Sequence, residues 1–78
     1  MTLAEALKRR IAELCAENNF TVNKLCTLSG LTHSTIASFL SSKTKVPKID
    51  TIYYISLGFG LSLSEFFDSP LFDNIDDN

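Results

Sequence analysis

The sequence predicts one small all-α domain built from five short helices. Apolar residues recur at steps of three and four, as on the buried face of an amphipathic helix; the first such stripe is Leu3, Leu7, Ile11 and Leu14. Residues that favour helix N-termini stand at the start of these periodic stretches. A chain of 78 residues supports a single core with little room for an enclosed catalytic cleft, which argues against an enzyme.

The first helix is expected over residues 3–18. Thr2 and Glu5 have the spacing of a capping box at its start. Asn18 and Asn19 end it, because asparagine tolerates the left-handed backbone conformation. The helix also carries a basic cluster, which nearby acidic residues offset and which is therefore interpreted as a solvated face. The cluster consists of Lys8, Arg9 and Arg10.

The stretch from Thr21 to Leu40 predicts two further helices joined by a tight turn. Thr21 caps the first of them and Thr32 the second, while Gly30 can take the positive φ that ends a helix without a Cβ penalty. The inward faces are Val22, Leu25 and Cys26 in the first helix and Ile36, Phe39 and Leu40 in the second. This spacing is that of a helix-turn-helix unit, although ordinary helical bundles contain similar pairs.

Two more helices follow a loop over residues 42–48, since Pro47 disfavours helix at the residue before it. Asp50 favours the start of a fourth helix, which Gly60 stops. Its predicted core face is Ile49, Ile52, Tyr53, Ile55 and Ser56. Ser62 and Glu65 form a second capping box, which opens a fifth helix through residues 66–67. Residues 68–78 are acidic and poor in core formers, so they are expected to be a tail.

The charged residues are distributed unevenly along the chain, although the net charge is only −2. No acidic residue occurs between Glu17 and Asp50, an interval that contains four lysines. Four of the nine acidic residues fall in the last eleven positions, and without those positions seven basic residues face five acidic ones. The local field around residues 18–49 is therefore predicted to be positive, as a nucleic-acid partner requires.

The cysteines, the N-terminus and the apolar runs indicate in which cellular compartment the protein is expected. Cys15 and Cys26 both fall on inward helical faces and are predicted to be reduced, buried thiols. Together with His33 they match no recognised metal-ligand spacing, so no metal or other cofactor is expected. The N-terminus lacks the pattern of a secretory signal and no apolar run could span a membrane, which predicts a cytoplasmic protein without membrane contact.

Four segments resemble the phage repressor/Cro helix-turn-helix family: Arg10 to Leu14, Leu25 to Ile36, Lys43 to Pro47, and Phe59 to Leu63. The resemblance extends from residue 10 to residue 67 without a gap. It implies a five-helix, lambda-repressor-like DNA-binding domain over residues 1–67, with the acidic tail at 68–78. It also implies a homodimer that binds double-stranded DNA, with the second helix of the helix-turn-helix unit in the major groove.

The outward face of that second helix is predicted to meet the bases. Solvent-facing helices usually carry lysine, glutamate, arginine or glutamine, and this helix has none of them before Lys43. Small side chains allow a helix backbone to approach the floor of a groove closely, and an alanine can contact a thymine methyl group. The candidate base contacts are Thr32, His33, Ser34, Ala37 and Ser38. Tight packing on a partner protein would favour the same small residues.

Phosphate contacts are predicted on both sides of this helix. Val22 lacks the polar side chain that the family often has there, so the backbone and the Thr21 hydroxyl remain to hold a phosphate. The lysines of the following loop can reach the flanking phosphates. The candidate phosphate contacts are Thr21, Lys24, Ser41, Lys43, Lys45 and Lys48.

The leading hypothesis is a sequence-specific DNA-binding transcriptional regulator that acts as a homodimeric repressor. Several apolar residues beside or within the acidic tail are predicted to form the dimer interface: Phe66, Leu71, Phe72 and Ile75. The alternative is a protein-interaction module, such as an antitoxin or adaptor, that uses the second helix of the unit and the tail to bind a protein partner.

Overall fold

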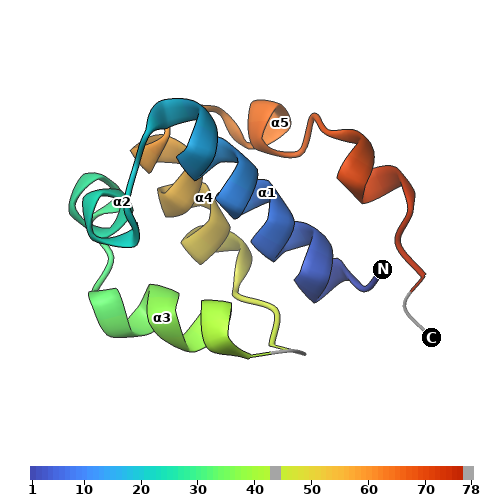
Figure 1. The fold of residues 1–78 in the computed structure, drawn as a ribbon, viewed down its shortest axis with the longest axis horizontal. Coiled ribbons are helices and arrows are strands. Elements are labelled where there is room, and N and C mark those ends of the chain that lie inside the picture. The colour runs from blue at the N-terminus through green and yellow to red at the C-terminus, as the bar shows by residue number, and fades with distance from the viewer. Residues whose placement is uncertain (43–44, 77–78) are drawn as a thin grey trace.

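The computed structural model describes residues 1–42 and 45–76, and within these ranges every regular element is helical. The elements in order are α1 (Leu3–Asn18), α2 (Val22–Ser29), α3 (His33–Ser41), α4 (Ile49–Gly58), α5 (Leu63–Phe66) and the 3₁₀ helix η1 (Pro70–Asp73). The all-α, five-helix prediction is thus confirmed. α3 lies along one edge of the molecule and α5 along the opposite edge, with α1 and α4 between them (Figure 1). No helix in the described ranges is long and apolar enough to cross a membrane.

The helix ends follow the predicted capping residues, with one exception. The hydroxyls of Thr2, Thr21, Thr32 and Ser62 each accept a hydrogen bond from the backbone N–H three residues later. Asp50 is the exception, because α4 starts one residue earlier and its N-cap, Lys48, makes no side-chain cap. The Asp50 carboxylate instead accepts from the N–H of its neighbour Thr51 at 2.8 Å.

Residues from all five α-helices and from the turn after α4 form one apolar core. Its buried members are Leu7, Ile11, Leu14, Leu25, Cys26, Ile36, Phe39, Ile52, Ile55, Phe59 and Phe66. α2 and α4 pack closely at Gly58, where glycine has no side chain. An added Cβ there would lie 3.2 Å from Leu25 Cδ1 and from the Cβ and backbone N of Ser29. Both cysteines are free, and partial burial raises the pKa of the Cys15 thiol.

The face of α4 differs from the prediction at two positions. Ile52, Ile55 and Ser56 are buried as expected, and the Ser56 hydroxyl donates to the carbonyl of Ile52. Ile49 and Tyr53, however, are 65% and 44% exposed, so their assignment to the core face is wrong. The buried face of α4 is therefore narrower than its apolar sequence suggests, because the described residues leave much of both side chains uncovered.

The segment after α5 folds back on the domain. Ser69 caps η1, which packs against α1, and the Phe72 ring lies 5.0 Å from the ring of Phe67 and 6.3 Å from that of Phe66. Phe66 itself is completely buried, which removes it from the residues available to a dimer interface. Beyond η1, the N-terminal amine donates to Asp76 Oδ1 at 2.7 Å, and this hydrogen bond lowers the pKa of that carboxyl group.

Arg10 joins α1 to α5 and is not part of a solvated basic face as interpreted from the sequence. Its side chain is buried, with Nε donating to the Phe66 carbonyl at 2.7 Å and Nη2 to the Glu65 carbonyl at 2.9 Å. The remaining nitrogen pairs with Glu13 at 2.7 Å. The planar guanidinium thus binds two carbonyls at the end of α5 while its charge is balanced. Of the other two bases in the cluster, Arg9 is exposed and Lys8 donates to the Ser42 carbonyl.

Replacing Arg10 with alanine should therefore destabilise the fold by about 2 kcal/mol, because two carbonyls lose a charged donor and one of these bonds is buried. Arg9→Ala, which removes the adjacent exposed charge, should change the free energy of unfolding by less than about 0.5 kcal/mol. Urea denaturation followed by circular dichroism measures both values. Equal losses for the two variants would contradict the assigned role of Arg10.

Candidate nucleic-acid interface

The turn between α2 and α3 sets the direction of α3. Gly30 has φ of +76° and ends α2, with its N–H donating to the Cys26 carbonyl at 3.1 Å. Two residues later Thr32 caps α3, so the two helices are joined by only three residues. Ile36 and Phe39 are then 1% and 2% exposed and fix α3 to the core. The opposite face of α3 is left to solvent.

The predicted base-contact residues lie on that free face. Thr32, His33, Ser34 and Ser38 are exposed, and Ala37 is half-buried. Ser41, predicted to contact phosphate, is exposed at the C-terminal end of the same helix. None of these side chains extends far from the helix except His33, so the backbone of α3 can approach a flat or grooved partner closely.

Hydroxyl groups gather at the N-terminal end of α3. Thr32 Oγ1 lies 2.8 Å from Thr35 Oγ1 and 3.3 Å from Ser34 Oγ, and it also accepts from the Thr35 N–H. Thr35 is exposed and belongs to this group, although it was not among the residues predicted from the sequence. The sequence could have indicated this exposure, because Thr35 directly precedes the buried Ile36. Consecutive residues lie about 100° apart around a helix, so Thr35 points away from the direction of Ile36.

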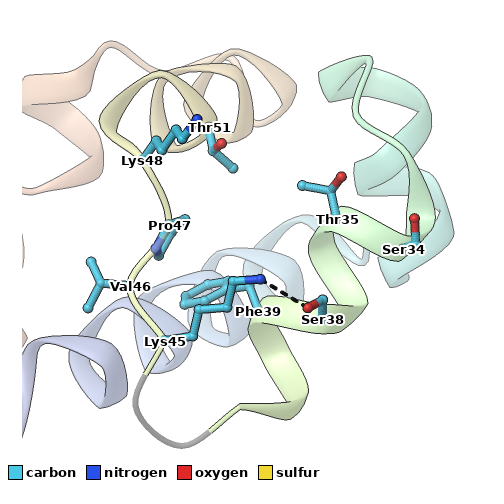
Figure 2. A pocket seen from close by; sticks show the side chains of 9 residues that line it. All are labelled: Ser34, Thr35, Ser38, Phe39, Lys45, Val46, Pro47, Lys48 and Thr51. Atoms are coloured by element: carbon cyan, nitrogen blue, oxygen red, sulfur yellow. Dashed lines mark hydrogen bonds between the residues drawn. The ribbon is translucent and has the colours of Figure 1, made fainter.

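The segment before α4 runs beside α3 and brings lysines to it. Lys45 Nζ donates to Ser38 Oγ at 3.1 Å (Figure 2). Lys48 is the N-cap of α4 and is exposed. Its position at the uncapped start of a helix places an ammonium group next to the positive end of the helix dipole, an arrangement that favours an anion.

Between α3 and this segment lies a groove of about 660 Å³. Ser34, Thr35 and Ser38 line it from α3, and Lys45, Lys48 and Thr51 face them across it (Figure 2). The groove thus brings together predicted base contacts and predicted phosphate contacts. Thr51 is a further lining residue that sequence reasoning missed, because its approach to α3 depends on the path of the loop.

The other predicted phosphate contacts lie on or before α2, or outside the described residues. Thr21 and Lys24 are exposed, but the Thr21 hydroxyl already accepts from the Lys24 N–H at 3.1 Å. It retains its own hydrogen for donation to a phosphate oxygen. Lys43 lies outside the described residues.

Within the described residues, the acidic segment after α5 lies away from α3. Figure 1 shows η1 and the residues up to 76 on the side of α1, whereas α3 occupies a different edge of the molecule. Asp50 is the acidic residue closest in sequence to the groove, and it accepts a backbone hydrogen bond in the first turn of α4. The acidic segment after α5 is thus separated from Lys45 and Lys48, which border the groove beside α3.

Comparison with known families agrees with this geometry. A family model described as the Cro/C1-type HTH DNA-binding domain matches residues 10–70. The chain belongs to this family. It is accordingly a helix-turn-helix, DNA-binding domain of the kind found in transcriptional regulators, and the resemblance inferred from the sequence is confirmed.

Individual relatives support the same assignment. The HTH-type transcriptional regulator PuuR of Escherichia coli strain K12 is 37% identical over 62 residues, and the protein of the same name from Shigella flexneri matches equally. Each alignment covers 80% of this chain but only 33% of the relative, so the chain spans about one third of their length. The crystal structure of the prophage Lp1 protein 11 is similar over 96% of this chain and 99% of its own, with 32% identity and a TM-score of 0.81.

Proposed function

We propose that this protein is a sequence-specific transcriptional repressor that binds an inverted repeat in double-stranded DNA as a homodimer, with α3 of each copy in the major groove. The observation that carries the proposal is the exposed face of α3. The hydroxyls and the single imidazole on this face can pair with base edges, and Lys45 and Lys48 border the groove beside α3. Repression follows from occupancy, since a bound dimer excludes other proteins from the same stretch of duplex.

The proposed contacts divide into two kinds. Thr32, His33, Ser34 and Ser38 would read base edges, and Ala37 would contact a thymine methyl group. The candidate phosphate contacts are Thr21, Lys24, Ser41, Lys43, Lys45 and Lys48, to which the groove adds Thr35 and Thr51. Two copies related by a two-fold axis would place their α3 helices about one turn of DNA apart, roughly 34 Å.

Affinity for DNA should fall steeply with salt. About four lysines per copy near phosphate give about eight contacts for a dimer, so the logarithm of the association constant should fall against that of salt concentration with a slope of roughly −7. Fluorescence anisotropy with a duplex selected from a random library measures this slope. A slope near zero would contradict the proposed phosphate contacts.

Substitutions should separate the two kinds of contact. Ser38→Ala removes a hydroxyl that would read a base edge, so it should weaken binding to the selected duplex roughly tenfold and to a random duplex by less than about twofold. Lys48→Ala should weaken binding to both duplexes alike and make the salt slope shallower by about 1 for each copy. The same anisotropy assay measures both.

Ser64→Ala provides the matched control, because Ser64 is an exposed serine on α5, at the edge opposite α3 (Figure 1). It should leave binding to either duplex unchanged. If Ser38→Ala behaves like this control, α3 does not read the bases through Ser38. If it weakens both duplexes equally, Ser38 supports binding without contributing to specificity.

A further inference from the structure

Large apolar side chains are exposed along one side of α4 and the loop before it. Val46, Ile49, Tyr53 and Leu57 are 48%, 65%, 44% and 49% exposed, and we call these four residues the apolar ridge. Ile49, Tyr53 and Leu57 stand at intervals of four residues and therefore follow one line along the helix. Figure 2 shows the Val46 side chain turned away from α3, unlike that of Lys45. Val46 also lines the groove beside α3, whereas Ile49, Tyr53 and Leu57 do not.

An apolar groove of about 250 Å³ lies directly beside the ridge. The groove is lined by Leu3 and Leu7 of α1, by Phe67, by Pro47 and Ile52, and by the ridge residues Val46 and Ile49. No lining residue carries a charge. The groove therefore suits an apolar side chain and is a poor match for phosphate or for a charged peptide.

We infer that the apolar ridge and the apolar groove form the surface through which two copies of this chain associate. A two-fold contact presents the same surface from both partners, so it requires a projection and a recess side by side on one face. Here Val46 and Ile49 project at the rim of the groove that a second copy's ridge would enter. That two copies associate rests on the proposed function. The place where they meet is inferred from the structure.

The size of the surface fits a dimer of modest stability. At the observed exposed fractions, the four side chains present roughly 400 Å², within the range of the largest apolar patches on monomers. A specific interface buries about 800 Å² on each partner. The ridge alone supplies about half of this area, and the groove walls on α1 and at Phe67 add to it. Tyr53 contributes an aromatic ring with a polar end, a side chain enriched in interfaces.

The surface also adjoins the candidate DNA interface. Val46 and Pro47 line both the apolar groove and the groove beside α3. Association here would therefore hold the partner next to the segment that carries Lys45 and Lys48. Of the residues predicted from the sequence for the dimer interface, Phe66 is buried and Phe72 packs on the rings of Phe66 and Phe67. Leu71 and Ile75 are half-buried, and their part in a dimer stays a prediction.

Sedimentation of the full chain without DNA tests the inference. The wild type should form dimers at concentrations of about 10 to 100 μM, as a modest interface predicts. Leu57→Lys and Ile49→Glu should each raise the dimer dissociation constant at least about tenfold, because they place a charge in the apolar contact. Leu28→Lys is the control, since Leu28 is 45% exposed and, like Leu57, is the penultimate residue of its helix, but it lies on α2.

Retention of the dimer by Leu28→Lys and its loss in both ridge variants, with unchanged circular dichroism, would support the inference. A wild type that remains monomeric up to about 1 mM, or a control that dissociates as readily as the ridge variants, would overturn it. The sedimentation experiment contains no DNA, so it tests dimer formation independently of DNA binding. A wild-type dimer that binds no duplex from a random library would refute DNA binding and leave the dimer surface standing.

Discussion

The burial of Ile36 and Phe39 is the constraint on which the candidate function depends. These two side chains fix one side of α3 in the core and so determine that the other side, with its small polar residues, faces outward. The short turn at Gly30 gives α3 its angle to α2, and the close approach at Gly58 holds α2 against α4. The orientation of the exposed face is therefore a consequence of core packing.

The far end of the domain is held by a different interaction. Arg10 binds the carbonyls of Glu65 and Phe66 and pairs with Glu13, so α5 is attached to α1 through a polar contact at the edge of an otherwise apolar core. Phe72 then covers the aromatic rings at this end. The acidic C-terminal segment is thereby kept on α1, away from the lysines beside α3.

The sequence predicted those features that depend on local chemistry. Caps such as Thr21 and Thr32 were predicted correctly, because a cap is determined by residues within one helical turn. Ile49 and Tyr53 were assigned to the core wrongly, since an apolar side chain is buried only if another element covers it. Arg10 was misinterpreted for the related reason that the two carbonyls it binds lie about 55 residues away. In the candidate site, the exposed side of α3 was predicted, whereas the contribution of Thr51 required the path of the loop.

If α3 and the segment leading into α4 bind DNA, their backbone amides should respond to it more strongly than those of the other elements. Titration of the ¹⁵N-labelled protein with a selected duplex, followed by amide chemical shifts, tests it most directly. The largest shifts should fall within residues 32–38 and 45–51, with small changes along α5 and η1. Large shifts confined to α1, α5 or η1, with α3 unaffected, would contradict this prediction.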